Sequence, residues 1–307
     1  RAIDGLGAAM LWPAAFSEMG AAVKDEDRQQ AMSFLNLCYM LGIALALPLG
    51  GFVNDMAHVK WAGLLLAAGL FACVSISVVV FIPNTPTPVR ADGSEPGGFK
   101  IGEFLRSIRQ IPAYLLLAVI TYAGIGFPMA IVKIFAQDAL GMSELAFGGL
   151  VFPAAILMAG AAVPMAKFGD RIGRIRAVHY GMGACAAGLI VIASGAIFPF
   201  MRSALILVIG SLPVGLGFLL AIPAWMASVS DIDAQRRGAN LGAVMTAQGI
   251  GAIIGAPVGA ALYDKLQPVG VELGLGPAFG YYAPWAGCAA CITAGWLVSL
   301  RILRDPK

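Results

Sequence analysis

Arg1 and Asp4 carry opposite charges inside an apolar run that is long enough to cross a membrane. They stand three positions apart, so a helix would place both side chains on one face. Ionisable groups within a membrane span are costly, and they usually face a cavity or one another. The pair could therefore form a proton or substrate-ion site, with a structural ion pair near the outer interface as the alternative.

A second charged group lies in the segment 166–176, AKFGDRIGRIR, which separates two long apolar runs. The segment holds four cations and one acid in a chain that is only 12% charged. Gly169 and Gly173 could supply a tight turn, and Asp170 could cap the helix that follows or pair with a cation. The pattern predicts a turn held at a membrane surface.

Nine apolar runs make up most of the chain, which is 59% hydrophobic. Soluble domains carry about twice its share of charged residues. Backbone groups in hydrocarbon must bond within their own segment, so we expect an all-α membrane protein with nine transmembrane helices. The expected spans are 2–23, 31–53, 61–82, 112–136, 146–166, 177–200, 203–228, 240–263 and 279–301.

Other kinds of chemistry find little support in the sequence. His58 and His179 are far apart and no phosphate-binding loop is present, so we predict neither an enzyme nor ATP-driven transport. Cys288-x-x-Cys291 lacks a second pair or a nearby histidine, which favours core-packing thiols over a metal or redox site. We expect no metal and no cofactor, and the small net charge of +3 predicts no nucleic-acid partner.

The distribution of lysine and arginine predicts the orientation in the membrane. Nine spans place fifteen of these cations in loops on one side and three on the other. An excess of cations marks the cytoplasmic side. The long polar break 83–110 contains four prolines and a Gly-Gly pair, which is typical of a linker. We therefore expect the linker, the 166–176 segment and the C-terminus to be cytoplasmic.

An internal repeat divides the chain. Residues 5–7, Gly-Leu-Gly, match residues 215–217 at a shift of 210, and Pro48 matches Pro257 at a shift of 209. Such a parallel repeat implies two six-helix halves, with Pro48 and Pro257 as candidate hinges. Because only nine spans are present, we expect three more helices before Arg1. The predicted domains are 1–82, the rest of a first bundle; 83–110, the linker; and 111–307, a second six-helix bundle.

The whole chain resembles transporters of the major facilitator superfamily. In that family a cytoplasmic loop in each half carries G-x-x-x-D-R-x-G-R-R, and Asp170, Arg171, Gly173 and Arg174 match it here. The family's fourth helix carries R-x-x-Q-G-x-G-A-A, which residues 1–9 match with Asp4 in place of glutamine. The fifth-helix motif of its export antiporters, G-x-x-x-G-P-x-x-G-G, is matched only loosely by residues 42–51.

The resemblance implies that the four matching hairpin residues form a cytoplasmic gate between the two halves. Asp231, at the cytoplasmic end of the seventh span, would be their acidic partner. Glu18 would play the corresponding part in the first half. A marker of membrane topology alone is the alternative.

Aromatic and polar residues on the spans expected to line a central cavity suggest what it would hold. They are Tyr122, Phe127, Trp225 and Gln248. An aromatic, sparsely polar cavity suits lipophilic or organic solutes, although such aromatics could equally serve helix packing. Gly251-x-x-x-Gly255 predicts a close helix contact.

These observations predict a monomeric secondary transporter of the plasma (inner) membrane, surrounded by the lipid bilayer, that moves a small organic solute by alternating access. Proton-coupled efflux is favoured, with Asp4 as the proton carrier and Arg1 modulating its proton affinity. A metabolite uptake symporter and a truncated fragment that transports nothing are the alternatives. A membrane enzyme is more distant, since the sequence has no polar catalytic cluster.

Overall fold

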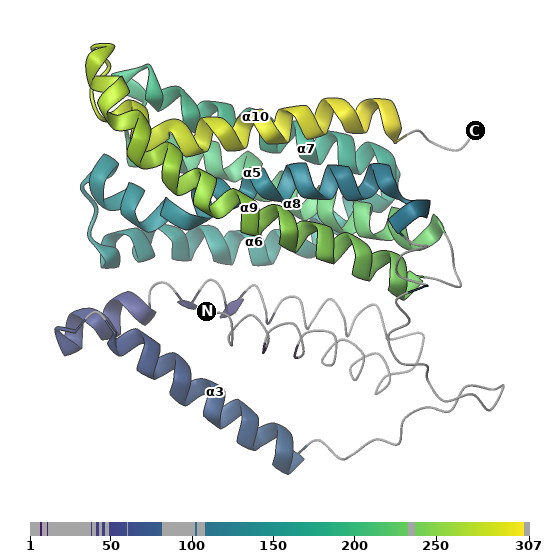
Figure 1. Ribbon diagram of the computed structural model, residues 1–307. Coiled ribbons are helices and arrows are strands. Elements are labelled where there is room, and N and C mark those ends of the chain that lie inside the picture. The colour runs from purple at the N-terminus through teal and green to yellow at the C-terminus, as the bar shows by residue number, and fades with distance from the viewer. Residues whose placement is uncertain are drawn as a thin grey trace.

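The structure, a computed structural model, describes residues 7, 11, 38, 41–42, 45–46, 49–59, 61–81, 102, 108–232 and 237–303. Over these residues it is helical, without strands. The long helices are α3 (Ala62–Phe81), α5 (Pro112–Leu140), α6 (Glu144–Ile172), α7 (Arg174–Ala193), α8 (Ala204–Ile232), α9 (Arg237–Glu272) and α10 (Ala278–Ile302). Two short 3-10 turns, η1 (Ser194–Ala196) and η2 (Pro199–Met201), join α7 to α8 (Figure 1).

Seven of the described helices are long and apolar enough to cross a membrane, and they correspond to the last seven predicted spans. The first two predicted spans, 2–23 and 31–53, lie largely outside the described residues. Several helices continue beyond the apolar run. α9 has 36 residues and is about 54 Å long, whereas the hydrocarbon core is about 30 Å thick. Its polar ends therefore extend past the bilayer core. The length of the apolar run in the sequence does not predict these helical extensions.

Short connections with suitable turn residues make successive helices antiparallel. Gly141 ends α5 in the left-handed conformation at φ 62°, and its backbone N–H donates to the Gln137 carbonyl at 3.0 Å. Ser143 then caps α6 by accepting a hydrogen bond from the Ala146 N–H at 3.2 Å. The first turns of α5, α7 and α9 consequently lie at the same end of the bundle as the last turns of α6, α8 and α10 (Figure 1).

We call the end that holds the α6–α7 turn the hairpin end, and the opposite end the far end. Described cations are concentrated at the hairpin end: Arg109, Lys167, Arg171, Arg174, Arg176 and Arg301. Lys133, Arg202 and Lys265 lie toward the far end. The segregation that the sequence count predicted between loops thus exists in space, among the described residues.

Two helix pairs, α5 with α9 and α7 with α8, are in close contact through glycine residues, and we call these two rows of glycine the glycine seams. In the α5·α9 pair, a Cβ placed on Gly251 would come 2.5 Å from the Val119 carbonyl oxygen. In the α7·α8 pair, a Cβ on Gly181 would come 2.5 Å from the Gly217 carbonyl oxygen. Backbones that approach this closely are typical of membrane helix contacts through small residues. The predicted Gly251-x-x-x-Gly255 contact is confirmed, and its partner is α5.

α10 covers both pairs, and large side chains pack between the helices. Phe135 of α5 packs edge to face against Tyr282 of α10, with ring centroids 4.9 Å apart.

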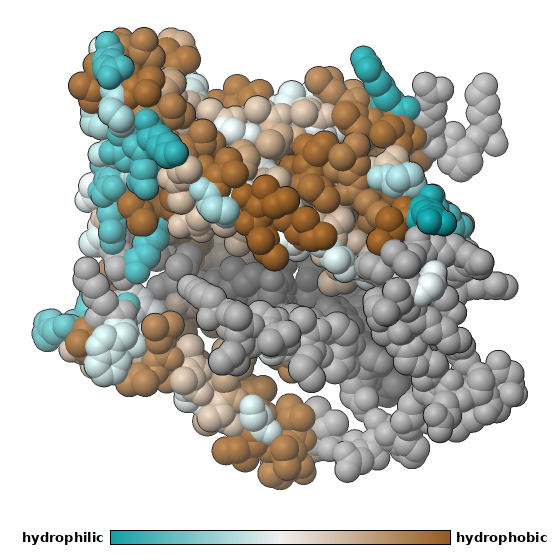
Figure 2. Space-filling model, in the orientation of Figure 1, coloured by the Kyte–Doolittle hydropathy of each residue, from teal (hydrophilic) through white to brown (hydrophobic). Residues whose placement is uncertain are grey.

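The outside of the molecule is apolar as well. Figure 2 shows hydrophobic side chains along the middle of α9 and along α3. None of the residues of α3 is buried. An apolar exterior over helices of this length suits a lipid environment.

Candidate functional site

A cavity of about 300 Å³ lies inside the bundle, between α5, α7, α8 and α10. Residues of each helix reach it at intervals of three or four, as one helix face requires. α5 contributes Leu117, Thr121, Ile125, Pro128, Met129 and Val132, and α7 contributes Val178, Met182, Cys185 and Leu189. α8 contributes Val214, Phe218, Ala221, Ile222 and Trp225, and α10 contributes Trp285, Cys288 and Ile292.

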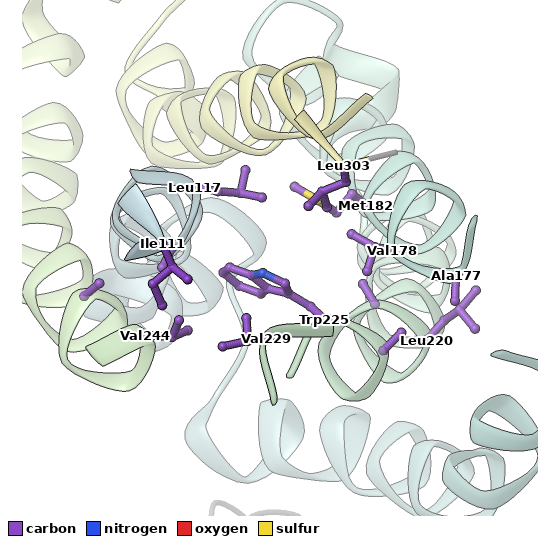
Figure 3. Packing of buried hydrophobic residues seen from close by; sticks show 14 residues of the cluster. Ile111, Leu117, Ala177, Val178, Met182, Leu220, Trp225, Val229, Val244 and Leu303 are labelled. Atoms are coloured by element: carbon purple, nitrogen blue, oxygen red, sulfur yellow. The ribbon is translucent and has the colours of Figure 1, made fainter. Parts of the chain in front are cut away.

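The glycine seams explain why the cavity lies where it does. α5 turns the face that holds Gly126 toward α9 and the face that holds Thr121 and Ile125 toward the cavity. α8 packs closely on α7 through Gly217, and its neighbouring face brings Trp225 into the space between the two helix pairs. Figure 3 shows the Trp225 indole lying between Leu117 on one side and Val178 and Met182 on the other.

The wall of the cavity carries no charged residue. The surface that the wall presents is apolar, because the Thr121 hydroxyl and the indole N–H groups of Trp225 and Trp285 belong to lining residues but are themselves covered. The thiol of Cys185 is engaged, since it donates to the Val214 carbonyl with a sulfur–oxygen distance of 3.2 Å. Pockets that bind small molecules are commonly lined by apolar and aromatic side chains with a few polar groups. This cavity has the apolar and aromatic part of that composition and lies at the lower end of the usual size range.

Of the four predicted cavity residues, Trp225 lines this cavity. Tyr122 and Phe127 lie on the opposite side of α5, in its contact with α9: the Tyr122 Cβ is adjacent to Gly251, and the Phe127 backbone to Gly259. The Phe127 ring also lies against Gly287 of α10. Gln248 of α9 is buried but is not part of the wall. A direct part in substrate binding stays a prediction for all four.

Other predicted site residues lie outside the described part of the chain. These are Arg1, Asp4, Glu18 and Pro48, together with the side chain of Asp231. The second predicted hinge, Pro257, lies within α9, which continues as a helix on both sides of it. Its ring is exposed, while Gly255 and Gly259 on either side of it face α5.

The predicted gate residues form a turn of one residue at the hairpin end. α6 ends at Ile172, α7 begins at Arg174, and Gly173 joins them at φ 91° and ψ 145°. Backbone with positive φ strongly favours glycine, so this position confirms the predicted turn glycine. The side chains of Asp170, Arg171 and Arg174 are exposed around it.

One expectation at this turn was wrong, and one of the two alternatives for Asp170 is excluded. Gly169 does not make the turn: it is buried inside α6, where a Cβ would come 3.2 Å from the Leu220 Cδ1 atom of α8. Asp170 does not cap the next helix, since α7 begins without any side-chain cap. A cap residue directly precedes the first turn of its helix, and Asp170 is still part of α6.

Sequence reasoning missed most of the cavity wall, including Thr121, Phe218 and Trp285. Thr121 and Ile125 stand four positions apart, so they share one face of a helix. By sequence, the adjacent aromatic residues Tyr122 and Phe127 had an equal claim to line a cavity. Only the contact between α5 and α9 determines which of the two faces is free to line a cavity.

Polar contacts at the far end hold the helices and loops together. The Tyr263 hydroxyl of α9 donates to the Asp138 carboxylate of α5 at 2.8 Å. Arg202, between α7 and α8, donates to the carbonyl of Gly195 at 2.8 Å and to the carbonyl of Leu275 at 3.3 Å. The second bond links the α7–α8 and α9–α10 loops. These contacts join helices and loops at the end of the bundle opposite the hairpin.

Comparison with known proteins identifies the family. The family profile of the Major Facilitator Superfamily matches residues 1–256 and, in a second overlapping match, residues 115–307. No match was found among curated proteins. The matches cover the whole chain and agree with the all-helical architecture. The chain belongs to the major facilitator superfamily, and it is a multi-pass membrane protein and a secondary transporter of that class.

Proposed function

We propose that the protein exports a small lipophilic organic solute by alternating access. The observation that carries this proposal is the cavity between α5, α7, α8 and α10, whose wall is aromatic and aliphatic and carries no charge. A charged or strongly hydrophilic metabolite would lose its hydration there without gaining a partner charge, which is costly. An apolar solute would gain from leaving water.

Proton coupling is the second part of the proposal, with Asp4 as the proton carrier and Arg1 as its charged neighbour. Its support is the sequence alone, where the pair falls three positions apart in an apolar run. Asp4 replaces the glutamine of the family motif, so a titratable group stands where the motif has none. We propose protons as the coupling ion for this reason.

The hairpin end supplies the proposed cytoplasmic gate. Arg171 and Arg174 are exposed on either side of the Gly173 turn, and we propose that they contact an acidic residue when the two halves close. Asp231 at the end of α8 is the proposed partner within this half. The surplus of cations at this end supports placing it in the cytoplasm, together with the linker and the C-terminus. We further propose that the protein is a monomer of the plasma (inner) membrane.

Transport in proteoliposomes tests the proposal. The full-length protein is reconstituted, an acidic lumen is imposed, and uptake of a neutral lipophilic dye is compared with leakage into protein-free vesicles. We expect saturable uptake that a protonophore abolishes. Asp4→Asn should lose accumulation driven by the pH gradient but keep dye counterflow, because the variant still binds and moves solute. Unchanged pH-driven accumulation in Asp4→Asn would remove Asp4 from the mechanism, and absence of dye counterflow in the wild type would overturn the proposed function.

A further inference from the structure

We propose that the loop between α7 and α8, residues 194–203, is a lipid-binding surface at the far end of the bundle. The loop lies at the boundary between the hydrocarbon core and the headgroups, and it inserts Ile197, Phe198 and Phe200 between the lipids of that leaflet. The inference goes beyond the proposed function, because it does not involve the transported solute. Its support is the exposed side chains of the loop, its hydrogen bonds, its packing on α10 and the length of α7.

The exposed side of the loop is apolar. Residues 194–201 read SGAIFPFM and contain no charge. Ile197 is 56% exposed, Phe198 is 46% exposed and Phe200 is 74% exposed. The two phenylalanine rings lie beside one another, with centroids 5.6 Å apart. Water in contact with such a patch is unfavourable, and contiguous exposed apolar surface commonly marks a site of contact with a membrane or a protein.

The backbone of the loop forms hydrogen bonds with itself, which is what a position with little water requires. The N–H groups of five loop residues donate to carbonyls of the same loop at 2.9–3.1 Å: Ile197, Phe198, Met201, Arg202 and Ser203. Pro199 has no N–H group to satisfy. The Ser194 hydroxyl, the first polar side chain of the loop, donates to the Val191 carbonyl at 2.6 Å. These groups therefore do not depend on water for a partner.

Arg202 directs its guanidinium toward backbone carbonyls. Its Nε atom donates to the Gly195 carbonyl at 2.8 Å, and its Nη2 atom donates to the carbonyls of Ala196 and Leu275 at 3.4 and 3.3 Å. Charged side chains at membrane depth are commonly paired with backbone carbonyls in this way. The cation of the loop is thus compatible with a position at the edge of the hydrocarbon core.

The loop is fixed on α10 by its other side. A Cβ placed on Gly195 would come 2.5 Å from the Tyr282 Cε1 atom, so the backbone of η1 lies directly on the ring. Gly195 and Ala196 are both buried. Because α10 occupies this inner side, the exposed side chains of the loop are left to the surroundings of the bundle.

The length of α7 places the loop at the edge of the hydrocarbon core. α7 begins at Arg174, beside the exposed charges of the hairpin end, and has 20 residues. It is therefore about 30 Å long, which equals the thickness of the core, and any tilt shortens the distance that it covers. α5, α6 and α8 have 29 residues each and are about 43 Å long. The short α7 thus ends where the lipid ends, and the loop begins there.

The accessibility of a spin label tests this placement in lipid nanodiscs that each hold one copy of the full-length protein. Phe200→Cys is made in a protein in which the exposed Cys38 and Cys73 are replaced by serine, and labelling of that parent is subtracted. Power saturation then measures how often the nitroxide collides with oxygen, which concentrates in lipid, and with a water-soluble nickel chelate.

Two further cysteine variants provide the references. Ile190→Cys places the label on α7 itself, where the native side chain is 54% exposed. Glu272→Cys places it at the exposed, charged end of α9. Oxygen collisions should exceed chelate collisions at Ile190, and the reverse should hold at Glu272. The label at Phe200 should follow Ile190, with a smaller excess of oxygen because it lies nearer to the headgroups.

Phe200→Cys should keep the wild-type Tm, because the side chain that it replaces is exposed. Phe198→Cys gives a second position in the same loop, and its label should also collide more often with oxygen. Two results would overturn the inference. An excess of chelate collisions at both positions would place the loop in water, and low collision rates with both reagents would show that protein covers it. Neither result depends on transport, so the proposed function is tested separately.

Discussion

Replacing Gly255 by alanine should weaken the contact between α9 and α5. The added Cβ would come into hard contact with the carbonyl oxygen of Ala123, and it would lie 2.9 Å from the Ala123 carbonyl carbon and 3.0 Å from its Cα atom. All of these are backbone atoms, which cannot rotate away as a side chain can. The two helices must therefore move apart, and neighbouring contacts at Gly251 and Gly259 loosen with them.

The size of the effect follows from two opposing terms. Overpacking a well-packed interior costs about 1–3 kcal/mol, and a rigid backbone clash belongs at the upper end of that range. Alanine is better than glycine in a helix by about 1 kcal/mol. The net loss is therefore about 2 kcal/mol. Since 1 kcal/mol shifts Tm by about 2–4 °C in a domain of about 200 residues, Gly255→Ala should lower Tm by about 4–8 °C.

Gly249→Ala provides the control on the same helix. A Cβ at Gly249 would meet nothing within 4 Å, so only the gain in helix propensity remains. This variant should leave Tm unchanged or raise it by about 2–4 °C.

Thermal unfolding can be followed with a fluorogenic maleimide, because Cys185 and Cys288 are buried and react only when the bundle opens. The exposed Cys38 and Cys73 are first replaced by serine to lower the background. Equal Tm values for Gly255→Ala and Gly249→Ala would refute the close contact between α5 and α9.

Four further substitutions test other parts of the structure, the first three in the same unfolding assay and the fourth by limited proteolysis. Gly173→Ala should lower Tm by several degrees, because alanine at φ 91° is strained by about 1–2 kcal/mol, and an unchanged Tm would contradict the one-residue turn. Tyr263→Phe removes the hydrogen bond to Asp138 and should cost about 0.5–1.5 kcal/mol, whereas an Asp138→Asn variant should lose less because its amide oxygen still accepts. Arg202→Gln should remove the hydrogen bond to the Leu275 carbonyl, so proteolytic cleavage of the α9–α10 loop should become faster. Cleavage at the wild-type rate would show that this hydrogen bond does not hold the loop in place.

The helices could be predicted from the sequence because their signal is local and strong. An uninterrupted apolar run such as 112–136 must form its own backbone hydrogen bonds in a membrane, whatever lies beside it. The turn at Gly173 was predictable for a similar reason, since two long apolar runs meet at a charged, glycine-containing segment. The helix ends were not, because polar residues of α9 continue the helix after the apolar run has stopped.

The cavity could not be predicted, because it depends on how one helix is rotated about its axis. Tyr122 and Thr121 are adjacent in sequence, and nothing local says which of them faces an opening. The glycines of α9 decide it by drawing the Tyr122 face of α5 into close contact, which leaves Thr121 toward the cavity. Trp225 was named on the same ground as Tyr122 and Phe127, its aromatic side chain, and of these three only Trp225 lines the cavity.

The central claim is that the transported solute binds in the cavity between α5, α7, α8 and α10, and one flux measurement tests it most directly. Met182, which is 7% exposed in the cavity wall, is changed to tryptophan so that the indole occupies the space. Met245, which is 54% exposed on α9, is changed to tryptophan as the control. In proteoliposomes of the full-length protein with an acidic lumen, Met182→Trp should abolish pH-driven dye uptake while retaining the wild-type Tm within a few degrees, and Met245→Trp should transport normally. Wild-type uptake by a folded Met182→Trp variant would contradict the claim.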